Sequence, residues 1–255
     1  MSSLGLGVAQ DYVEARNQFE KAAERGNPGA MNNLGNLYEK GHGVAQDYAA
    51  ARLWYEKAAA LGDVPALSNL GGLYENGHGV PQNYVTARNL YELAAGLGYA
   101  VAMRHLGILY MNGRGVPQDY AQGRNLFLKA AALDDSGAMI GLGNAYYYGR
   151  GVATDYVQAR NWYEKAAALG NSEAMNNLGS MYYRGDGVAS DDVAARVWFQ
   201  KAADLGDTNA MLGLGLFYED GRGGVPRSRD QARKWYQKAS DGGNEYAKTR
   251  LKYLK

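Results

Sequence analysis

Apolar residues recur along the chain at the spacing of amphipathic helices. In residues 30–38, Met31, Leu34, Leu37 and Tyr38 fall three or four positions apart, so they share one face of a helix. This pattern predicts a first helix in which one side is buried and the other side faces solvent.

A second helical pattern follows after a polar turn. In residues 48–59, small Ala51 and Ala58 alternate with large Trp54 and Tyr55. Alternation of small and large side chains suits close packing of one helix against another. The two segments together predict a pair of antiparallel helices.

The helix pair repeats along the chain. A Gly-Val dipeptide closes the turn between the two helices every 36 residues, at Val8, Val44, Val80, Val116, Val152 and Val188. The next valine, Val225, comes one residue late because Gly223-Gly224 contains an insertion. A period in the mid-thirties is typical of helix–turn–helix repeats, which stack on their neighbours to bury their apolar faces.

Residues at the predicted helix ends agree with this division. The residues predicted to cap the second helices are Asp11, Asp47, Asn83, Asp119, Asp155, Asp191 and Ser228, and those before the first helices are Asn27, Asp63, Tyr99, Asp135, Asn171, Asp207 and Asn244. All except Tyr99 carry a side-chain oxygen that can accept from the free N–H groups of a first helical turn. The glycines predicted to end the second helices are Gly26, Gly62, Gly98, Gly170 and Gly206, with Asp134 replacing glycine once.

A glycine also recurs inside each first helix, directly after the repeat leucine. These residues are Gly35, Gly71, Gly107, Gly143, Gly179 and Gly215. Because an internal glycine costs a helix about 1 kcal/mol relative to alanine, its recurrence predicts a point where two helices cross too closely for a side chain.

The predicted fold is all-α: a right-handed α/α superhelical solenoid of antiparallel helix pairs with 36-residue repeats. We expect one repeat domain over residues 1–255. Its parts are a half repeat at 1–26, full repeats at 27–62, 63–98, 99–134, 135–170, 171–206 and 207–243, and a C-terminal capping helix at 244–255. Lys248 and Lys252 replace the usual methionine and glycine in this last helix, which suits a face in contact with water.

The first unit contains only its second helix, predicted at about residues 11–25. Leu4, Leu6, Val13 and Phe19 would then lack their usual covering helix. We therefore expect that the chain is a piece of a longer repeat protein or self-associates through this end. Alternatively, the leading residues fold over the exposed helix.

Composition narrows the classes of partner. The chain has 27 Lys plus Arg against 26 Asp plus Glu, so it offers no excess of positive charge for nucleic acid or an anionic membrane. Cysteine is absent, which excludes disulfides and thiolate metal sites. No stretch approaches the roughly 20 apolar residues of a membrane span. We therefore expect a protein or peptide partner, no nucleic acid and no membrane insertion.

The combined motif resembles the Sel-one-like repeat family, a subclass of the tetratricopeptide superfamily. It reads Ala-x-x-x-Leu-Gly-x-x-Tyr-x-x-Gly-x-Gly-Val-x-x-Asp, followed by Ala-x-x-Trp-Tyr-x-Lys-Ala-Ala-x-x-Gly. Residues 137–170 match it almost throughout. The resemblance implies an adaptor or scaffold that holds other proteins together, of a kind frequent in bacteria and sometimes exported. Properties of cysteine-rich relatives are not carried over, and the compartment stays unknown, with export to the periplasm among the possibilities.

The resemblance also implies that the first helices line a concave binding surface. The candidate residues are those at variable positions of these helices: Asn32, Asn33, Asn36, Ser68, Asn69, Arg104, His105, Asn144, Tyr147, Tyr148, Asn176, Asn177, Tyr183 and Arg184. An asparagine amide both donates to and accepts from an extended backbone, tyrosines supply rigid contact area, and arginines anchor carboxylates. Alternatively, the asparagines bond across to the next repeat and the tyrosines belong to the core between repeats.

Catalytic chemistry is not indicated, and we expect no catalytic residues, cofactor or metal. His42 and His78 occupy equivalent turns one repeat apart, but an exposed variable turn explains them better than a shared metal does. Recurrent arginines on the second helices are expected to pack their stems and meet nearby carboxylates. These are Arg16, Arg52, Arg88, Arg124, Arg160, Arg196 and Arg233.

The leading hypothesis is therefore a non-enzymatic protein-interaction scaffold that binds a peptide or protein on its concave face. One alternative is an envelope-associated enzyme or accessory factor acting on cell-wall material, which needs a cluster of titratable groups in the groove. Another is a self-assembling structural fragment of a longer repeat protein.

Overall fold

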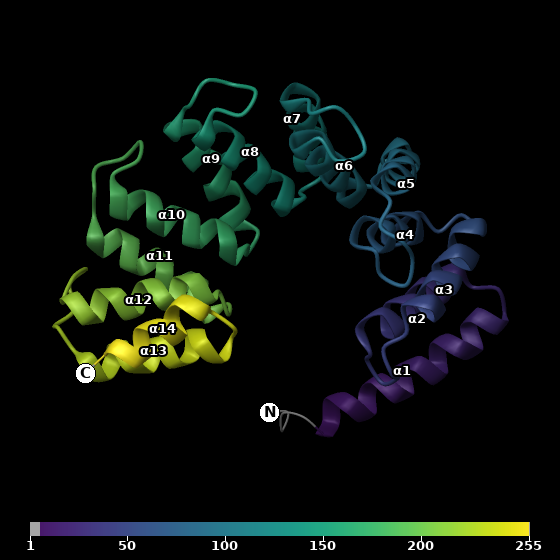
Figure 1. Cartoon of the computed structure of the whole chain (residues 1–255), viewed down its shortest axis with the longest axis horizontal. Coiled ribbons are helices and arrows are strands. Elements are labelled where there is room, and N and C mark those ends of the chain that lie inside the picture. Colours follow the sequence, from purple (N-terminus) through teal and green to yellow (C-terminus); the bar gives the residue numbers. More distant parts are fainter. Residues whose placement is uncertain (1–5, 255) are drawn as a thin grey trace. The chain divides into compact units, whose positions relative to one another are not determined.

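In the computed structural model, the described residues 6–254 form helices joined by short turns (Figure 1). Side chains are described from residue 11 onward. The chain divides into two compact units, residues 1–130 and 131–255. Fourteen helices and no strands occur among the described residues, which confirms the predicted all-α solenoid of helix pairs.

In the first unit, second-type helices alternate with first-type helices. They are α1 (Leu6–Glu24), α2 (Pro28–Lys40), α3 (Tyr48–Ala60), α4 (Val64–Asn76), α5 (Tyr84–Gly96), α6 (Ala100–Asn112) and α7 (Tyr120–Ala131). The even-numbered helices are the first helices of the repeats.

The second unit continues the alternation. Its helices are α8 (Ser136–Tyr148), α9 (Tyr156–Ala168), α10 (Ser172–Arg184), α11 (Asp192–Asp204), α12 (Thr208–Asp220), α13 (Arg229–Asp241) and α14 (Glu245–Tyr253). Figure 1 shows these helices packed as successive antiparallel neighbours, from green α8 to yellow α14.

Side-chain caps begin the helices as predicted, with one correction. The Asn27 side chain accepts from the Ala30 N–H at 2.9 Å, and equivalent bonds recur at the other predicted caps, while Tyr99 makes none. Asp11 is wrong as a cap, because α1 already begins at Leu6 and Asp11 lies inside it. In the next repeat the cap residue Asp47 is fixed by its N–H bonding to the Tyr38 carbonyl of the preceding helix. Asp11 has no preceding helix among the described residues.

The predicted helix-ending residues adopt the left-handed conformation. Gly26, Gly62 and their equivalents have φ between +80° and +91°, a region in which glycine carries no steric penalty. Asp134, which replaces this glycine once, has a φ of +59° and is the one non-glycine residue with positive φ among the described residues.

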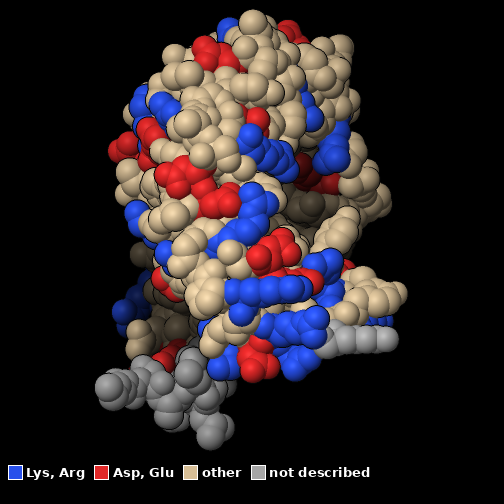
Figure 2. Space-filling model, turned by 90° about the vertical axis from the view of Figure 1, so that its left-hand side faces the viewer, with Lys and Arg blue, Asp and Glu red and all other residues tan. Residues whose placement is uncertain are grey.

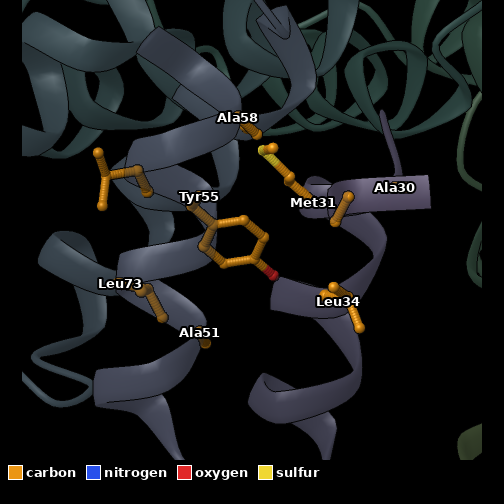
Figure 3. Close-up of a cluster of buried hydrophobic side chains, with 10 residues drawn as sticks. Ala30, Met31, Leu34, Ala51, Tyr55, Ala58 and Leu73 are labelled. Atoms are coloured by element: carbon orange, nitrogen blue, oxygen red, sulfur yellow. The ribbon is translucent and has the colours of Figure 1, made fainter. Parts of the chain in front are cut away.

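The internal glycine of each first helix packs against an aromatic ring of the following helix. A Cβ at Gly71 would lie 2.7 Å from Cε1 of Tyr91, and one at Gly35 would overlap the Tyr55 ring. Figure 3 shows Tyr55 reaching from α3 toward α2 between Met31 and Leu34. The same pairing recurs at Gly107–Phe127, Gly143–Tyr163, Gly179–Phe199 and Gly215–Tyr236. This confirms the predicted close crossing and identifies the buried aromatic ring as its cause.

The C-terminal helix meets solvent as predicted. Ala247 of α14 is buried, whereas Lys248 and Lys252 are exposed. Figure 2 shows Lys and Arg side chains gathered at the lower end of the face, where α13 and α14 lie. Near the N-terminal end of the sequence, the Phe19 side chain is half-buried against the core cluster that contains Leu34 and Tyr55, and Val13 is exposed. Leu4 and the side chain of Leu6 lie outside the described residues.

Gly71→Ala tests the close crossing. The added methyl group would overlap the Tyr91 ring, so we expect a loss of about 2 kcal/mol in the free energy of unfolding. Combining it with Tyr91→Leu should make the two losses less than additive, because the shortened side chain removes the clash. Urea unfolding followed by circular dichroism measures all three variants.

The matched control is Gly96→Ala in α5, where nothing lies within 4 Å of an added Cβ. This change should be neutral or stabilise by up to about 1 kcal/mol, through helix propensity. Equal losses from Gly71→Ala and Gly96→Ala would contradict the packing explanation.

Candidate functional site

Four of the six rings in the glycine–aromatic pairs are tyrosines, whose hydroxyl groups reach the first-helix surface. Tyr91 donates to a Glu75 carboxylate oxygen at 2.7 Å, Tyr55 donates to Glu39 at 2.5 Å, and Tyr236 donates to Glu219 at 2.5 Å. Burial and these carboxylates raise the pKa of all three tyrosines. These three glutamates are therefore acceptors for buried hydroxyls.

Where phenylalanine replaces the buried tyrosine, the carboxylate is replaced as well. Phe127 is accompanied by Met111 at the position of the glutamate, and Met111 is buried. A Cβ at Gly123 would lie 2.7 Å from Met111 Cγ, so the glycine makes room for the larger apolar side chain. In this repeat an apolar pair thus replaces the polar pair.

In the first unit, most candidate residues are engaged with one another. Asn69 donates to the Asn32 side-chain oxygen at 2.8 Å, and Asn36 donates to the Asn32 carbonyl and accepts from Tyr55. Ser68 is only 4% exposed, so its side chain does not face a partner, which corrects its assignment to the binding surface. Here the alternative interpretation, that asparagine bonds across repeats, is confirmed.

His105 is also committed to internal contacts. Its ring stacks on Tyr91 with centroids 5.1 Å apart, and its Nδ1 lies 3.6 Å from Glu75. Burial alone would raise the pKa of Glu75, but the nearby His105 ring and the hydrogen bond from Tyr91 outweigh burial, so the pKa is lowered. Arg104 is half-buried on the same helix, and its charge acts on Tyr91. Asn33 is the exposed one among the candidate asparagines of this unit, and its side chain forms no hydrogen bond within the described part of the chain.

In the second unit, five of the candidate residues meet around one cavity of about 130 Å³ between α8 and α10. They are Asn144, Tyr147, Tyr148, Asn177 and Arg184, joined by Tyr163, Ser180 and Met181. Ser180 occupies one of the variable first-helix positions, whereas sequence reasoning had not placed Tyr163 and Met181 at the site. Tyr163 could have been found from its pairing with Gly143, which positions its hydroxyl as in the other repeats.

Hydrogen bonds hold part of this cavity in place. The Tyr163 hydroxyl donates to the Asn144 side-chain oxygen at 2.6 Å, and the Tyr147 hydroxyl donates to Asp186 at 2.6 Å. Arg184 donates to the Tyr147 hydroxyl at 3.2 Å. Burial and the bond to Asp186 raise the pKa of Tyr147, so it stays a neutral donor near neutral pH.

Asn176 and Asn177 differ from their equivalents in the first unit. Neither side chain forms a hydrogen bond within residues 6–254. The residue equivalent to Asn32 in the preceding repeat is Ile140, which cannot hydrogen-bond to Asn177 through its side chain. The residue equivalent to Asn69 in the following repeat is Gly213, which has no side chain to bond to Asn176. The amide of Asn177 is therefore available at the cavity.

Tyr183 belongs to a neighbouring cavity of about 110 Å³ on the other side of α10. Its wall also contains Phe199, Gly213, Leu216, Phe217, Asp220 and Arg222. Arg222 is held by Asp192 at 2.9 Å and by the Tyr183 hydroxyl at 3.0 Å. The two cavities thus lie on either side of α10.

The recurrent arginines are structural, as expected, and have a partner that the sequence did not show. Arg88 Nη1 donates to the Gly115 carbonyl at 3.2 Å, and Arg160 and Arg196 make the equivalent bond to the turn of the next repeat. Each of Arg16, Arg52, Arg88 and Arg160 also lies within 3.5 Å of a glutamate four residues later.

The two turn histidines stack on tyrosines rather than facing each other. His42 lies on Tyr12 and His78 on Tyr48, with ring centroids 4.4 and 4.5 Å apart. Among the residues that the structure describes, no group of three or more His, Asp or Glu is arranged to hold a metal ion. None of the helices in that part of the chain has the length and apolarity to cross a membrane.

Comparison with known proteins places this architecture in a family. The sequence model of the Sel1 repeat matches seven successive segments: 1–27, 28–63, 64–99, 100–135, 136–171, 172–207 and 208–244. The chain belongs to the Sel1 repeat family. The matched segments begin one residue after the boundaries expected from the caps. Sel1 repeat proteins are in general protein-interaction scaffolds, and the repeat is in general a non-enzymatic fold.

Solved structures agree with this assignment. A Sel1 repeat protein from Oxalobacter formigenes is 32% identical, with a TM-score of 0.79 over 90% of this chain and 99% of that one. A protective antigen of uropathogenic Escherichia coli is 38% identical, with a TM-score of 0.73 over 94% of this chain. The chain spans 51% of that antigen. Yeast Tom70, at 15% identity and a TM-score of 0.59, shares the fold alone. No curated protein matches the sequence.

The lowered pKa of Glu75 predicts a pH dependence of stability. Its pKa in the folded chain is below its ordinary value of 4.5, so its contribution is complete above that pH and is lost as the pH falls through the lowered pKa. We expect Glu75→Gln to lower the melting temperature at pH 6 and to lower it less at pH 3.5. Thermal unfolding at both values measures this difference.

Glu92→Gln is the control, because it changes only an exposed pair with Arg88 at 3.5 Å. A deficit of Glu75→Gln that is the same at both pH values would show that the charge of Glu75 does not act as described.

Proposed function

We propose that this Sel1 repeat chain is a protein-interaction scaffold that binds an extended segment of a partner on the first-helix surface of α8, α10 and α12. The observation that carries the proposal is the unoccupied amide of Asn177 at the wall of a 130 Å³ cavity. An asparagine amide can donate to a backbone carbonyl and accept from a backbone N–H at the same time.

The contrast with the first unit supports this location. Asn32 and Asn69 satisfy each other at 2.8 Å, and a partner would have to break that bond to use them. Asn177 has no such bond within the described residues, so a partner gains its hydrogen bonds without that loss. Asn33 offers the same kind of amide in the first unit, but it borders neither of the two cavities described.

Other groups around Asn177 suit recognition of a peptide. Tyr148 is 61% exposed and is held between Tyr147, with ring centroids 4.9 Å apart, and the Arg150 guanidinium, 5.2 Å from its centroid, so it offers rigid contact area. Tyrosine hydroxyls and the Arg184 guanidinium supply further donors. Hydrogen bonds of Tyr147 and Asn144 preorganise these groups, which reduces the entropy lost on binding.

Selection of twelve-residue peptides from a random phage-displayed library on the chain tests the proposal. We expect the selected peptides, made synthetically with a fluorescent label, to bind Asn177→Ala about tenfold more weakly than the wild type. Thermal stability should be unchanged, because the amide makes no internal bond. Fluorescence anisotropy measures the affinity.

The matched control is Lys165→Ala on α9, which removes an ammonium group that lies over a tryptophan ring on the second-helix side. The Lys165 ammonium lies 4.1 Å from the centroid of Trp162. If peptides lose affinity for Lys165→Ala and keep it for Asn177→Ala, the binding surface is on the second helices and the proposal is wrong.

A further inference from the structure

The two cavities beside α10 differ in chemistry. The cavity that contains Asn177 has the guanidinium of Arg184 at its wall, together with tyrosine hydroxyls. The neighbouring cavity is formed by the rings of Phe199 and Phe217 with Leu216 and Gly213. One side of α10 therefore suits a polar anionic group, and the other side suits an apolar group.

Arg184 is an exposed cation that forms no direct ion pair among the residues whose side chains are described. Its guanidinium donates to the Tyr147 hydroxyl, which in turn donates to Asp186, so Asp186 acts on Arg184 only across that hydroxyl. Arg222 and Asp220 both border the apolar cavity, but Arg222 is already paired with Asp192, whereas Asp220 adds a negative charge to the wall. An acidic side chain is thus attracted to Arg184 and repelled from Asp220.

Gly213 opens the apolar cavity. Asparagine occupies the equivalent position in three other repeats, at Asn33, Asn69 and Asn177. A Cβ at Gly213 would lie 3.3 Å from the Phe199 ring, so any side chain here would fill space beside that ring. The volume of about 110 Å³ is smaller than the roughly 150 Å³ of a cavity that holds benzene, which favours an aliphatic side chain over an aromatic ring.

The spacing follows from the helix that separates the cavities. An α-helix with its side chains is about 10 Å across, and an extended chain advances about 3.3 Å per residue. A segment that crosses α10 therefore places side chains about three residues apart into the two cavities.

We infer that the partner segment carries an acidic side chain at Arg184 and an aliphatic side chain of leucine size in the Gly213 cavity, about three residues apart. This inference rests on the proposed function and specifies the ligand of that same surface. Arg184 and Gly213 then determine specificity, while Asn177 holds the peptide backbone.

The test uses the peptides selected on the wild-type chain and synthetic versions of the tightest of them. We expect an Asp or Glu and a Leu, Ile, Val or Met three residues apart in most selected sequences. Changing the aliphatic residue to alanine should weaken binding about tenfold, and changing the acid to its amide about threefold to fivefold. A peptide in which the acidic and aliphatic residues lie six positions apart should lose the affinity that both residues contribute.

Protein variants assign each contribution to its cavity. Gly213→Asn should weaken the leucine peptide about tenfold and leave the alanine peptide unchanged, and Arg184→Gln should remove the difference between the acid and amide peptides. Circular dichroism establishes that each variant is folded. If Gly213→Asn does not fold, the peptide substitutions on the wild-type chain still decide the inference.

The outcomes separate the inference from the proposed function. Peptides that depend on Asn177 but contain no acidic–aliphatic pair, or that carry an aromatic side chain at the second position, overturn the inference and leave the proposed function intact. Peptides that do not depend on Asn177, or a library without binders, overturn both. Sedimentation of the chain alone tests whether a second copy of the chain fills the cavity. Self-association that Gly213→Asn abolishes would also overturn the inference.

Discussion

The close contact between a helical glycine and an aromatic ring is the constraint on which the repeat depends. At Gly71 the absence of a Cβ lets the Tyr91 ring lie against the backbone of α4, and the same contact occurs in every full repeat. A glycine inside a helix costs stability, and burial of a whole aromatic ring more than offsets that loss. The distance between the two helices is thereby set from within the repeat.

This contact also determines what the first-helix surface can offer. Where the ring is Tyr55, Tyr91 or Tyr236, its hydroxyl emerges beside the following turn of the first helix and donates a hydrogen bond to Glu39, Glu75 or Glu219. Those carboxylates are consequently part of the framework. Side chains that the framework does not use, above all Asn177 and Arg184, are the ones left for recognition.

Much of the fold could be predicted because the same helix-pair pattern recurs several times along the chain. The caps, the left-handed Asp134 and the close glycine crossing all follow from local rules that apply at each recurrence. The start of α1 could not be predicted from the same rules, since the Asp11 cap depends on a carbonyl from a preceding helix.

The candidate surface was predicted from the helix face, but Ser68 is buried and Asn69 is bonded to Asn32. Contacts between repeats depend on two sequence positions 36 or 37 residues apart, so one repeat alone does not reveal them. The cavities at Tyr163 and Gly213 depend on side-chain volumes that no single repeat reveals.

Asparagines whose side chains already bond within the chain take no part in binding, whereas the unbonded Asn177 contacts the partner. Side-chain amide signals in ¹⁵N NMR spectra test this most directly, by following each NH₂ group as a selected peptide is titrated into the chain. We expect a large shift for Asn177 and little change for Asn36 and Asn69. Large shifts at Asn36 and Asn69 with an unmoved Asn177 signal would contradict it.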